Sequence, residues 1–233
     1  MHCWFQRAAM TAINVLITEN AAHVLTDGLC AAPGLGPIAV PKVIPLPHLR
    51  MAVATRGPAE LLQVMLPIIS AAPSFKDLVE FFRNDFRALT KLQHPNWPAG
   101  IFKRDFDIVI AGWSKSGPAA FLITSSVGHG IPTWEPFFFG NFLCTPKVSD
   151  DAFEAFHASP DPLRDFIGVL DYQAAREPAV GGFAQLTTIT SDEISTRILK
   201  RYPPKEIVRA SAFQSASRPI ELSGALKKAI AKL

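Results

Sequence analysis

Apolar and polar positions alternate near the start of the chain in the pattern that short strands produce. Two apolar runs, Ala12–Ile17 and Ala22–Thr26, are separated by a polar connection of hairpin length. We therefore predict that they pair as an antiparallel ribbon. A stretch rich in Gly and Pro follows over residues 32–37, and two more strands are predicted after it, at Pro41–Pro45 and Arg50–Thr55.

Helical patterning begins at Gly57-Pro58, because proline suits the first turn of a helix and Glu60 is favourable near its positive end. This helix is predicted to run to Ile69. Ser74 suits the N-cap of a second helix. The apolar face of that second helix repeats at helical spacing through Leu78, Phe82, Phe86 and Leu89.

Strand-like patterning returns in the middle of the chain. Three strands are predicted, over Phe106–Trp113, Ala119–Ser125 and Thr133–Phe139. Two helices are predicted to follow, one from Ser149 to Phe156 and one from Asp161 to Arg176.

Two strands, Phe183–Thr190 and Ile194–Leu199, and a terminal helix, Leu222–Leu233, complete the pattern. The order is strands, a helix pair, strands, a helix pair and strands. This order suits two antiparallel sheets that pack face to face with helices on the outside. The predicted fold class is therefore α+β, with a short leader over residues 1–10 and one domain over residues 11–233.

Composition supports a folded domain and disfavours several functions. Hydrophobic residues make up 48% of the 233 positions and charged residues 18%, so the chain can bury one substantial core. The net charge is only +3, and the basic residues are scattered except for a few near the C-terminus, so we expect no nucleic-acid surface. No apolar run is long enough to span a membrane, so no membrane association is expected.

Cysteine usage favours a reducing compartment. Cys3, Cys30 and Cys144 form no CxxC pair and have no metal-like spacing with histidine. We therefore expect a cytoplasmic protein that needs no cofactor and no metal. Residues 1–10 lack the long apolar core of a secretory signal and resemble a short leader or an upstream extension of the reading frame.

Thr11, Asp27 and Lys42 together suggest nucleophilic catalysis by a threonine hydroxyl. Such a hydroxyl needs a base, and an α-amino group at the chain start, with a pKa of roughly 7.7–8.0, can serve as one. A lysine beside the hydroxyl lowers the pKa of both groups, and a buried aspartate holds that lysine. Adjacent strands lie about 4.8 Å apart, so we expect the three side chains to meet on neighbouring strands.

Gly57 is the candidate donor to the oxyanion, since it lies between a strand and the predicted helix start, where a helix dipole would orient its amide. Each of these residues also has an ordinary structural interpretation. Asp27-Gly28 is a turn signal, Gly57-Pro58 starts helices, and a lone strand lysine usually lies on a solvated face.

Taken together, residues 11–66 resemble proteasome β-type and HslV-type peptidases of the N-terminal nucleophile (Ntn) hydrolase family. The resemblance is carried by Thr11-Ala12-Ile13, Thr26-Asp27-Gly28, Lys42-Val43 and Ala54–Glu60, and it continues more weakly through 108–139 and Val180–Gln185.

The resemblance implies a four-layer αββα sandwich and hydrolysis of a peptide or amide substrate. Thr11 would be the nucleophile and its own amine the base, with Asp27, Lys42 and Gly57 in the supporting positions. It also implies a homo-oligomer built as a ring or stacked rings, with an ATP-dependent unfoldase as a possible partner.

The chain departs from the family pattern at three places. Residues 139–142 lack the serine expected in a Gly/Ser-rich turn after the mid-chain strands. Residues 177–181 keep an acid but lose the hydroxyl of the late Asp-x-x-Ser-Gly element. Arg56 replaces a small residue beside Gly57.

Two alternatives stay open beside the threonine hydrolase. One is an inactive relative that keeps the fold as a structural or binding subunit of an oligomer, and the other is an unrelated α/β domain. Activity requires that Thr11 become the first residue. If translation starts at Met10, removal of methionine would achieve this, and if it starts at Met1, the chain must cut itself between Met10 and Thr11.

Overall fold

Five antiparallel strands form the larger sheet of the computed structural model, which describes residues 11–32, 36–58, 60–91 and 97–204. Their spatial order is β11-β10-β2-β1-β9. The strands are β1 (Ile13–Ile17), β2 (Ala22–Asp27), β9 (Phe142–Thr145), β10 (Phe183–Ile189) and β11 (Ile194–Arg201). The predicted ribbon of the first two strands is confirmed, with Ile13 opposite Thr26.

A second antiparallel sheet has the order β5-β6-β7-β8. Its strands are β5 (Val43–Leu46), β6 (Met51–Arg56), β7 (Asp107–Ser114) and β8 (Gly117–Thr124). A separate two-stranded hairpin, β3 (Leu29–Ala32) and β4 (Gly36–Ala39), lies between β2 and β5 in the chain. The structure is therefore α+β, as predicted.

The helices come in two groups that match the two predicted helix pairs. They are α1 (Leu61–Ser70), α2 (Phe75–Asn84), the short α3 (Phe86–Leu89), α4 (Asp150–His157) and α5 (Pro162–Arg176). The predicted N-caps Ser74, Ser149 and Asp161 all accept hydrogen bonds from the first turns of their helices. Short 3-10 turns occur at Pro47–Leu49, Ile101–Lys103 and Val127–His129.

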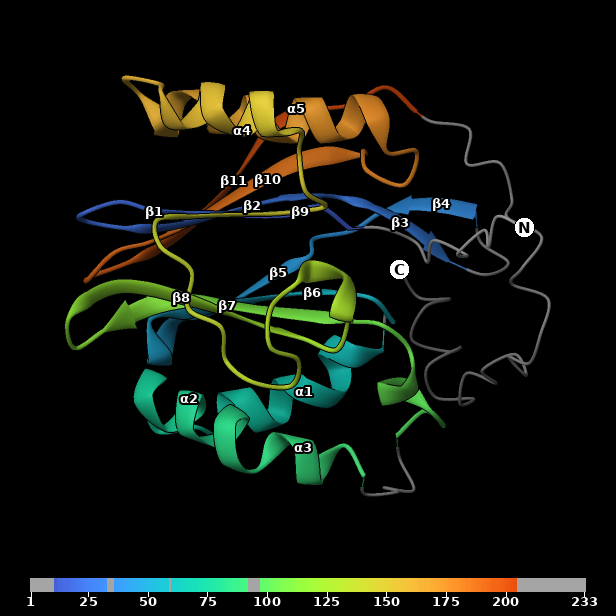
Figure 1. Cartoon of the computed structure of the whole chain (residues 1–233), viewed down its shortest axis with the longest axis vertical. Coiled ribbons are helices and arrows are strands. Elements are labelled where there is room, and N and C mark those ends of the chain that lie inside the picture. Colours follow the sequence, from blue (N-terminus) through green and yellow to red (C-terminus); the bar gives the residue numbers. More distant parts are fainter. Residues whose placement is uncertain (1–10, 33–35, 59, 92–96, 205–233) are drawn as a thin grey trace, which may run out of the picture. The chain divides into compact units, whose positions relative to one another are not determined.

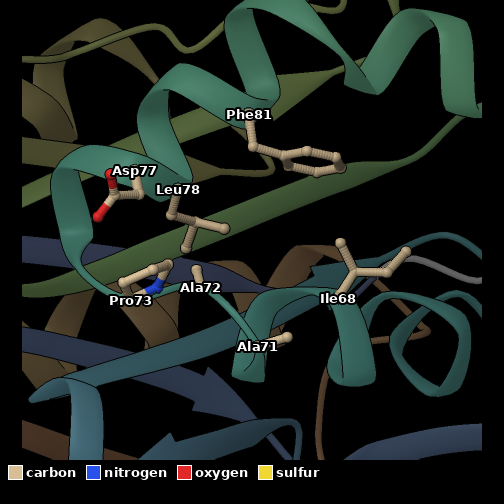
Figure 2. A pocket seen from close by; sticks show the side chains of 7 residues that line it. All are labelled: Ile68, Ala71, Ala72, Pro73, Asp77, Leu78 and Phe81. Carbon is tan, nitrogen blue, oxygen red and sulfur yellow. The ribbon is translucent and has the colours of Figure 1, made fainter.

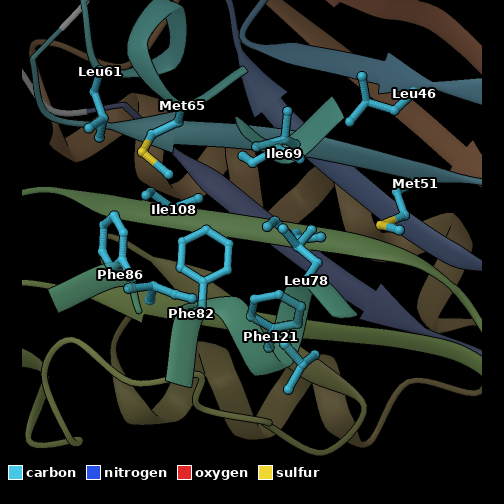
Figure 3. Packing of buried hydrophobic residues seen from close by; sticks show 14 of the residues in the cluster. Leu46, Met51, Leu61, Met65, Ile69, Leu78, Phe82, Phe86, Ile108 and Phe121 are labelled. Carbon is cyan, nitrogen blue, oxygen red and sulfur yellow. The ribbon is translucent and has the colours of Figure 1, made fainter. Parts of the chain in front are cut away.

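Three clusters of buried hydrophobic side chains connect these elements. One joins α1, α2 and α3 to the four-stranded sheet and includes Phe82 and Phe121, as Figure 3 shows. A second joins α4 and α5 to the five-stranded sheet. The third lies between the two sheets, which face one another with helices on their far sides (Figure 1).

The alternation along β1 shows how the sequence produces this packing. Ile13 and Val15 belong to the cluster between the sheets, whereas Ala12 and Leu16 belong to the cluster under α4 and α5. Successive side chains of a strand point to opposite faces, so a strand buried on both faces is apolar at nearly every position.

One strand prediction is wrong, and three strands were not predicted. Thr133–Phe139 is not a strand, because only Phe137 forms an isolated bridge, with Leu122 of β8. The strand in this region is β9, Phe142–Thr145, which pairs with β1. The hairpin of β3 and β4 was also missed, because its Gly and Pro residues read as a loop.

The described residues all fall in one compact unit. Two predicted segments, the leader over 1–10 and the terminal helix Leu222–Leu233, lie outside the described residues, so the prediction of one domain over 11–233 remains a prediction. Among the helices that the structure describes, none combines the length and apolar character needed to cross a membrane.

Candidate active site

Asp27, the last residue of β2, is the centre of the candidate site. Its side chain is fully buried, and its two carboxylate oxygens accept four hydrogen bonds. Oδ1 accepts from the backbone N–H of Ala12 at 2.9 Å and from Nζ of Lys42 at 2.8 Å. Oδ2 accepts from the N–H groups of Leu29 at 3.0 Å and Gly181 at 3.1 Å. A buried carboxylate needs such donors, because leaving it unpaired would be unfavourable by several kcal/mol.

The hairpin of β3 and β4 brings Lys42 back to Asp27. The N–H of Val40 donates to the carbonyl of Gly28 at 2.8 Å, which closes the base of the hairpin. Lys42 directly precedes β5, which is a strand of the four-stranded sheet. The expectation that Lys42 meets Asp27 from an adjacent strand of the same sheet is therefore wrong, since the ion pair joins the two sheets.

Burial works against the positive charge of Lys42, and Asp27 works in its favour. Its side chain is only 8% exposed, and burial lowers the pKa of its ammonium below the usual value. The charge and hydrogen bond of Asp27 oppose this shift without cancelling it. The ion pair with Asp27 therefore offsets part of the desolvation of the ammonium.

Thr11 is joined by its peptide bond to Ala12, and the backbone N–H of Ala12 donates a hydrogen bond to Asp27. This hydrogen bond ties the chain at Thr11 to the ion pair. Thr11 is two residues before Ile13, so the alternation along β1 places it on the side of the sheet that faces the four-stranded sheet. Lys42 directly precedes β5 of that four-stranded sheet. Its side chain is partly exposed. Among the described residues, no hydrogen bond joins its hydroxyl to Lys42.

The loop between α5 and β10 is a supporting element that sequence reasoning missed. Gly181 donates its N–H to Asp27 and accepts, at its carbonyl, the N–H of Gly28 at 3.0 Å. Gly182 has a φ of +73°, and a Cβ there would lie 3.0 Å from Leu29 N. Gly182, which belongs to the Gly-Gly pair that contributed to the family resemblance, thus owes its residue type to its positive φ and its close approach to the backbone after β2.

Gly57 follows β6 at the same end of the sheets. The expected helix dipole is not there to orient its amide, because α1 begins only at Leu61 with Glu60 as its N-cap. Gly57 instead has a φ of +118°, and a Cβ there would lie 2.6 Å from the carbonyl oxygen of Asp105. Its special geometry therefore comes from packing against the start of β7.

A second ionic cluster lies at this end of the sheets, and sequence reasoning did not predict it. Arg56 pairs with Asp107, and His129 contacts the same carboxylate. Burial pushes the pKa of Asp107 upward, but the hydrogen bond from His129 and the charge of Arg56 outweigh it and hold the pKa below its usual value. The presence of Arg56 beside Gly57 was the sequence signal for this cluster.

The segment between β9 and α4 includes a residue with a hydroxyl group. β9, Phe142–Thr145, pairs with β1, and the turn that follows it is residues 146–149. This turn does contain a hydroxyl, Ser149. Its Oγ accepts the N–H of Ala152 at 3.3 Å and caps α4.

Two buried polar atoms beside Asp27 have no hydrogen-bond partner among the described residues. They are Oγ1 of Thr26 and Oε1 of Gln185. Thr26 and Gln185 are register partners on β2 and β10. Buried polar groups are usually satisfied, often by ordered water, so this pair marks a polar spot inside an otherwise apolar layer.

Two pockets lie away from these residues. One, of about 170 Å³, is lined from α1 and α2 by side chains such as Ile68 and Phe81 (Figure 2). Another, of about 290 Å³, lies between α4 and α5. In the part of the chain that the structure describes, no group of three or more His, Cys, Asp or Glu side chains is arranged to hold a metal ion.

Comparison with known proteins adds no family assignment. The sequence matches no protein-family model, and a search of curated proteins finds no match.

Proposed function

We propose that the protein is a threonine-type Ntn hydrolase that cleaves peptide or amide bonds. Thr11 becomes the nucleophile after loss of residues 1–10, and its free amine acts as the base. The observation that carries the proposal is the double contact of Asp27 Oδ1, which holds the amide of Ala12 and the Nζ of Lys42 in a buried setting. One anion thus fixes the backbone beside the nucleophile and the cation that activates it.

The order of packing also supports this proposal. Helices, sheet, sheet and helices follow one another through three hydrophobic clusters, which is the order of the four-layer αββα sandwich. In the proposed reaction, the Thr11 amine takes the hydroxyl proton as the oxygen attacks the carbonyl carbon. The tetrahedral intermediate then breaks its C–N bond, the leaving amine takes that proton, and water hydrolyses the ester left on Thr11. Lys42 stabilises the developing alkoxide, and the N–H of Gly57 donates to the oxyanion.

An inactive relative with a structural or binding role is the second candidate. It is favoured by the use of Ser149 as a helix cap, because the only hydroxyl of the turn after β9 is engaged in structure. In either case we propose a cytoplasmic homo-oligomer, built as a ring or stacked rings, with an ATP-dependent unfoldase as the partner of the active form.

The test compares proteins produced with Thr11 as the first residue. We expect hydrolysis of peptide amides by the mature protein and at least a hundredfold lower kcat in Lys42→Met, on the order of the loss seen when one electrostatic group is removed from an active site. Lys76→Met, which removes an exposed lysine of α2, is the control. A mature protein that starts at Thr11 yet cleaves no amide would favour the inactive relative.

A further inference from the structure

Arg56 connects the two sheets at the end where the candidate site lies. It is the last residue of β6, and its Nη1 donates to Asp107 Oδ2 at 2.7 Å and to Thr145 Oγ1 at 3.1 Å. Thr145 ends β9 and is the register partner of Ile13 in β1. One guanidinium therefore joins β6, which leads into Gly57, to β9, which pairs with β1.

Asp107 fixes the direction of this guanidinium. Its side chain is 1% exposed, and the Nε2 of His129 lies 3.1 Å from Oδ1 and 3.2 Å from Oδ2. Asp107 is also the register partner of Arg56 on the neighbouring strand. Arg56 and His129 are partly exposed, at 23% and 27%, so the buried carboxylate of Asp107 is the fixed centre of the cluster.

Gly57 depends directly on the position of Arg56. It is the next residue in the chain, its φ of +118° requires glycine, and its Cα faces the backbone of Asp105 and Phe106 without room for a Cβ. Those two residues immediately precede Asp107. The amide of Gly57 is therefore held between Arg56 on one side and the residues that lead into Asp107 on the other.

We propose that Arg56 is a positioning residue, which holds the oxyanion donor Gly57 at a fixed place relative to Thr11 by bonding Asp107 and the Thr145 hydroxyl at once. This inference rests on the proposed function. It also assigns a role to Arg56, which stands where the resembled family carries a small residue.

The hydroxyl of Thr145 offers the sharpest test, because it can be removed without a change in volume. In the mature protein, Thr145→Val keeps the Arg56–Asp107 pair but removes the bond between the sheets, whereas Thr145→Ser keeps that bond. We expect Thr145→Val to lower kcat about tenfold with little change in KM, a smaller loss than the hundredfold or more that follows removal of an oxyanion donor. Thr145→Ser should restore most of the activity.

A second measurement separates positioning from mere folding. The affinity for a peptide aldehyde, which forms a tetrahedral adduct with Thr11, should fall in Thr145→Val by about the same factor as kcat/KM. Arg56→Lys is shorter by one atom and should show the same two losses if Thr145→Val fails to fold. Arg83→Lys, on the exposed surface of α2, is the matched control and should change neither quantity.

The outcomes are distinguishable. If the wild-type mature protein is active and Thr145→Val and Arg56→Lys both keep its kcat and aldehyde affinity, the positioning role is wrong and the proposed function stands. If Thr145→Val and Thr145→Ser lose activity to the same extent, the hydrogen bond from Arg56 to the hydroxyl at position 145 is not the cause of the loss. That result also overturns the inference. If the wild-type protein is inactive toward amides and aldehyde, both proposals fall.

Discussion

Asp27 is the residue on which the site depends, because one carboxylate organises three separate parts of the chain. It holds the start of β1 through Ala12, the four-stranded sheet through Lys42, and the α5–β10 loop through Gly181. Each of these contacts is buried. The loss of this charge is therefore expected to affect folding and activity together.

Asp27→Asn tests this dependence. The asparagine amide would place an N–H₂ group against existing donors and leave Lys42 buried without a counter-charge, so we expect a loss of about 3–5 kcal/mol in the free energy of unfolding. Denaturant unfolding measures the loss. Glu80→Gln, which breaks an exposed pair with Lys76, should cost below about 1 kcal/mol. Equal small losses in both variants would contradict this account of Asp27.

Lys42 gives a pH dependence of defined sign. Its folded-state pKa lies below the ordinary value of 10.5, because burial disfavours the ammonium. In the window between the folded pKa and 10.5, the unfolded chain binds a proton that the folded chain has lost, so the free energy of unfolding rises with pH there. Lys42→Met should remove this rise.

The measurement is the difference in unfolding free energy between wild type and Lys42→Met at several pH values up to 10.5. The account predicts that wild type gains relative to the variant as pH increases. A flat difference, or one that falls with pH, would show that the Lys42 ammonium is not disfavoured in the fold.

At the residue scale, sequence reasoning placed Asp27 and Lys42 together but did not predict their surroundings. The order of Thr11, Asp27 and Lys42 suggested a shared site, and the structure does bring Asp27 and Lys42 into contact. The bond of Gly181 to Asp27 and the bond of Arg56 to Thr145 join residues far apart in sequence. No local pattern encodes such contacts.

At the scale of elements, the sequence predicted helix N-caps correctly, because a cap depends only on residues within one turn. Ser74, Ser149 and Asp161 cap helices because a side-chain oxygen accepts a nearby N–H. Strand assignment failed at Thr133–Phe139, where aromatic residues have high strand propensity but find only one bridge. Partners elsewhere in the chain, which propensity does not describe, decide whether such a segment pairs.

Phe82 of α2 tests the packing between helices and sheet. It is fully buried, and its ring lies 4.9 Å from that of Phe86 and 5.9 Å from that of Phe121, centroid to centroid. Phe82→Ala should lower the free energy of unfolding by about 3–5 kcal/mol, because it opens a cavity between α2 and β8. Its partly buried neighbour Phe81 should tolerate the same change better, and comparable losses at both positions would contradict the assigned faces of α2.

At the scale of the whole described unit, two polar links join the sheets at one end. Lys42–Asp27 connects β5 to β2, and Arg56–Thr145 connects β6 to β9. In the sheet order, β1 lies between β2 and β9, so each of its two neighbouring strands carries one of these links. The sequence order of elements predicted the packing of two sheets, whereas these links required the three-dimensional structure.

The most direct test of the central claim is the intact mass of the mature protein after reaction with a threonine-directed electrophile. The account predicts a chain that starts at Thr11 and gains one adduct, mapped to Thr11, with no adduct in Thr11→Ala. A protein that starts at Thr11 and takes no adduct, or takes it at another residue, would contradict the assignment of Thr11 as the nucleophile.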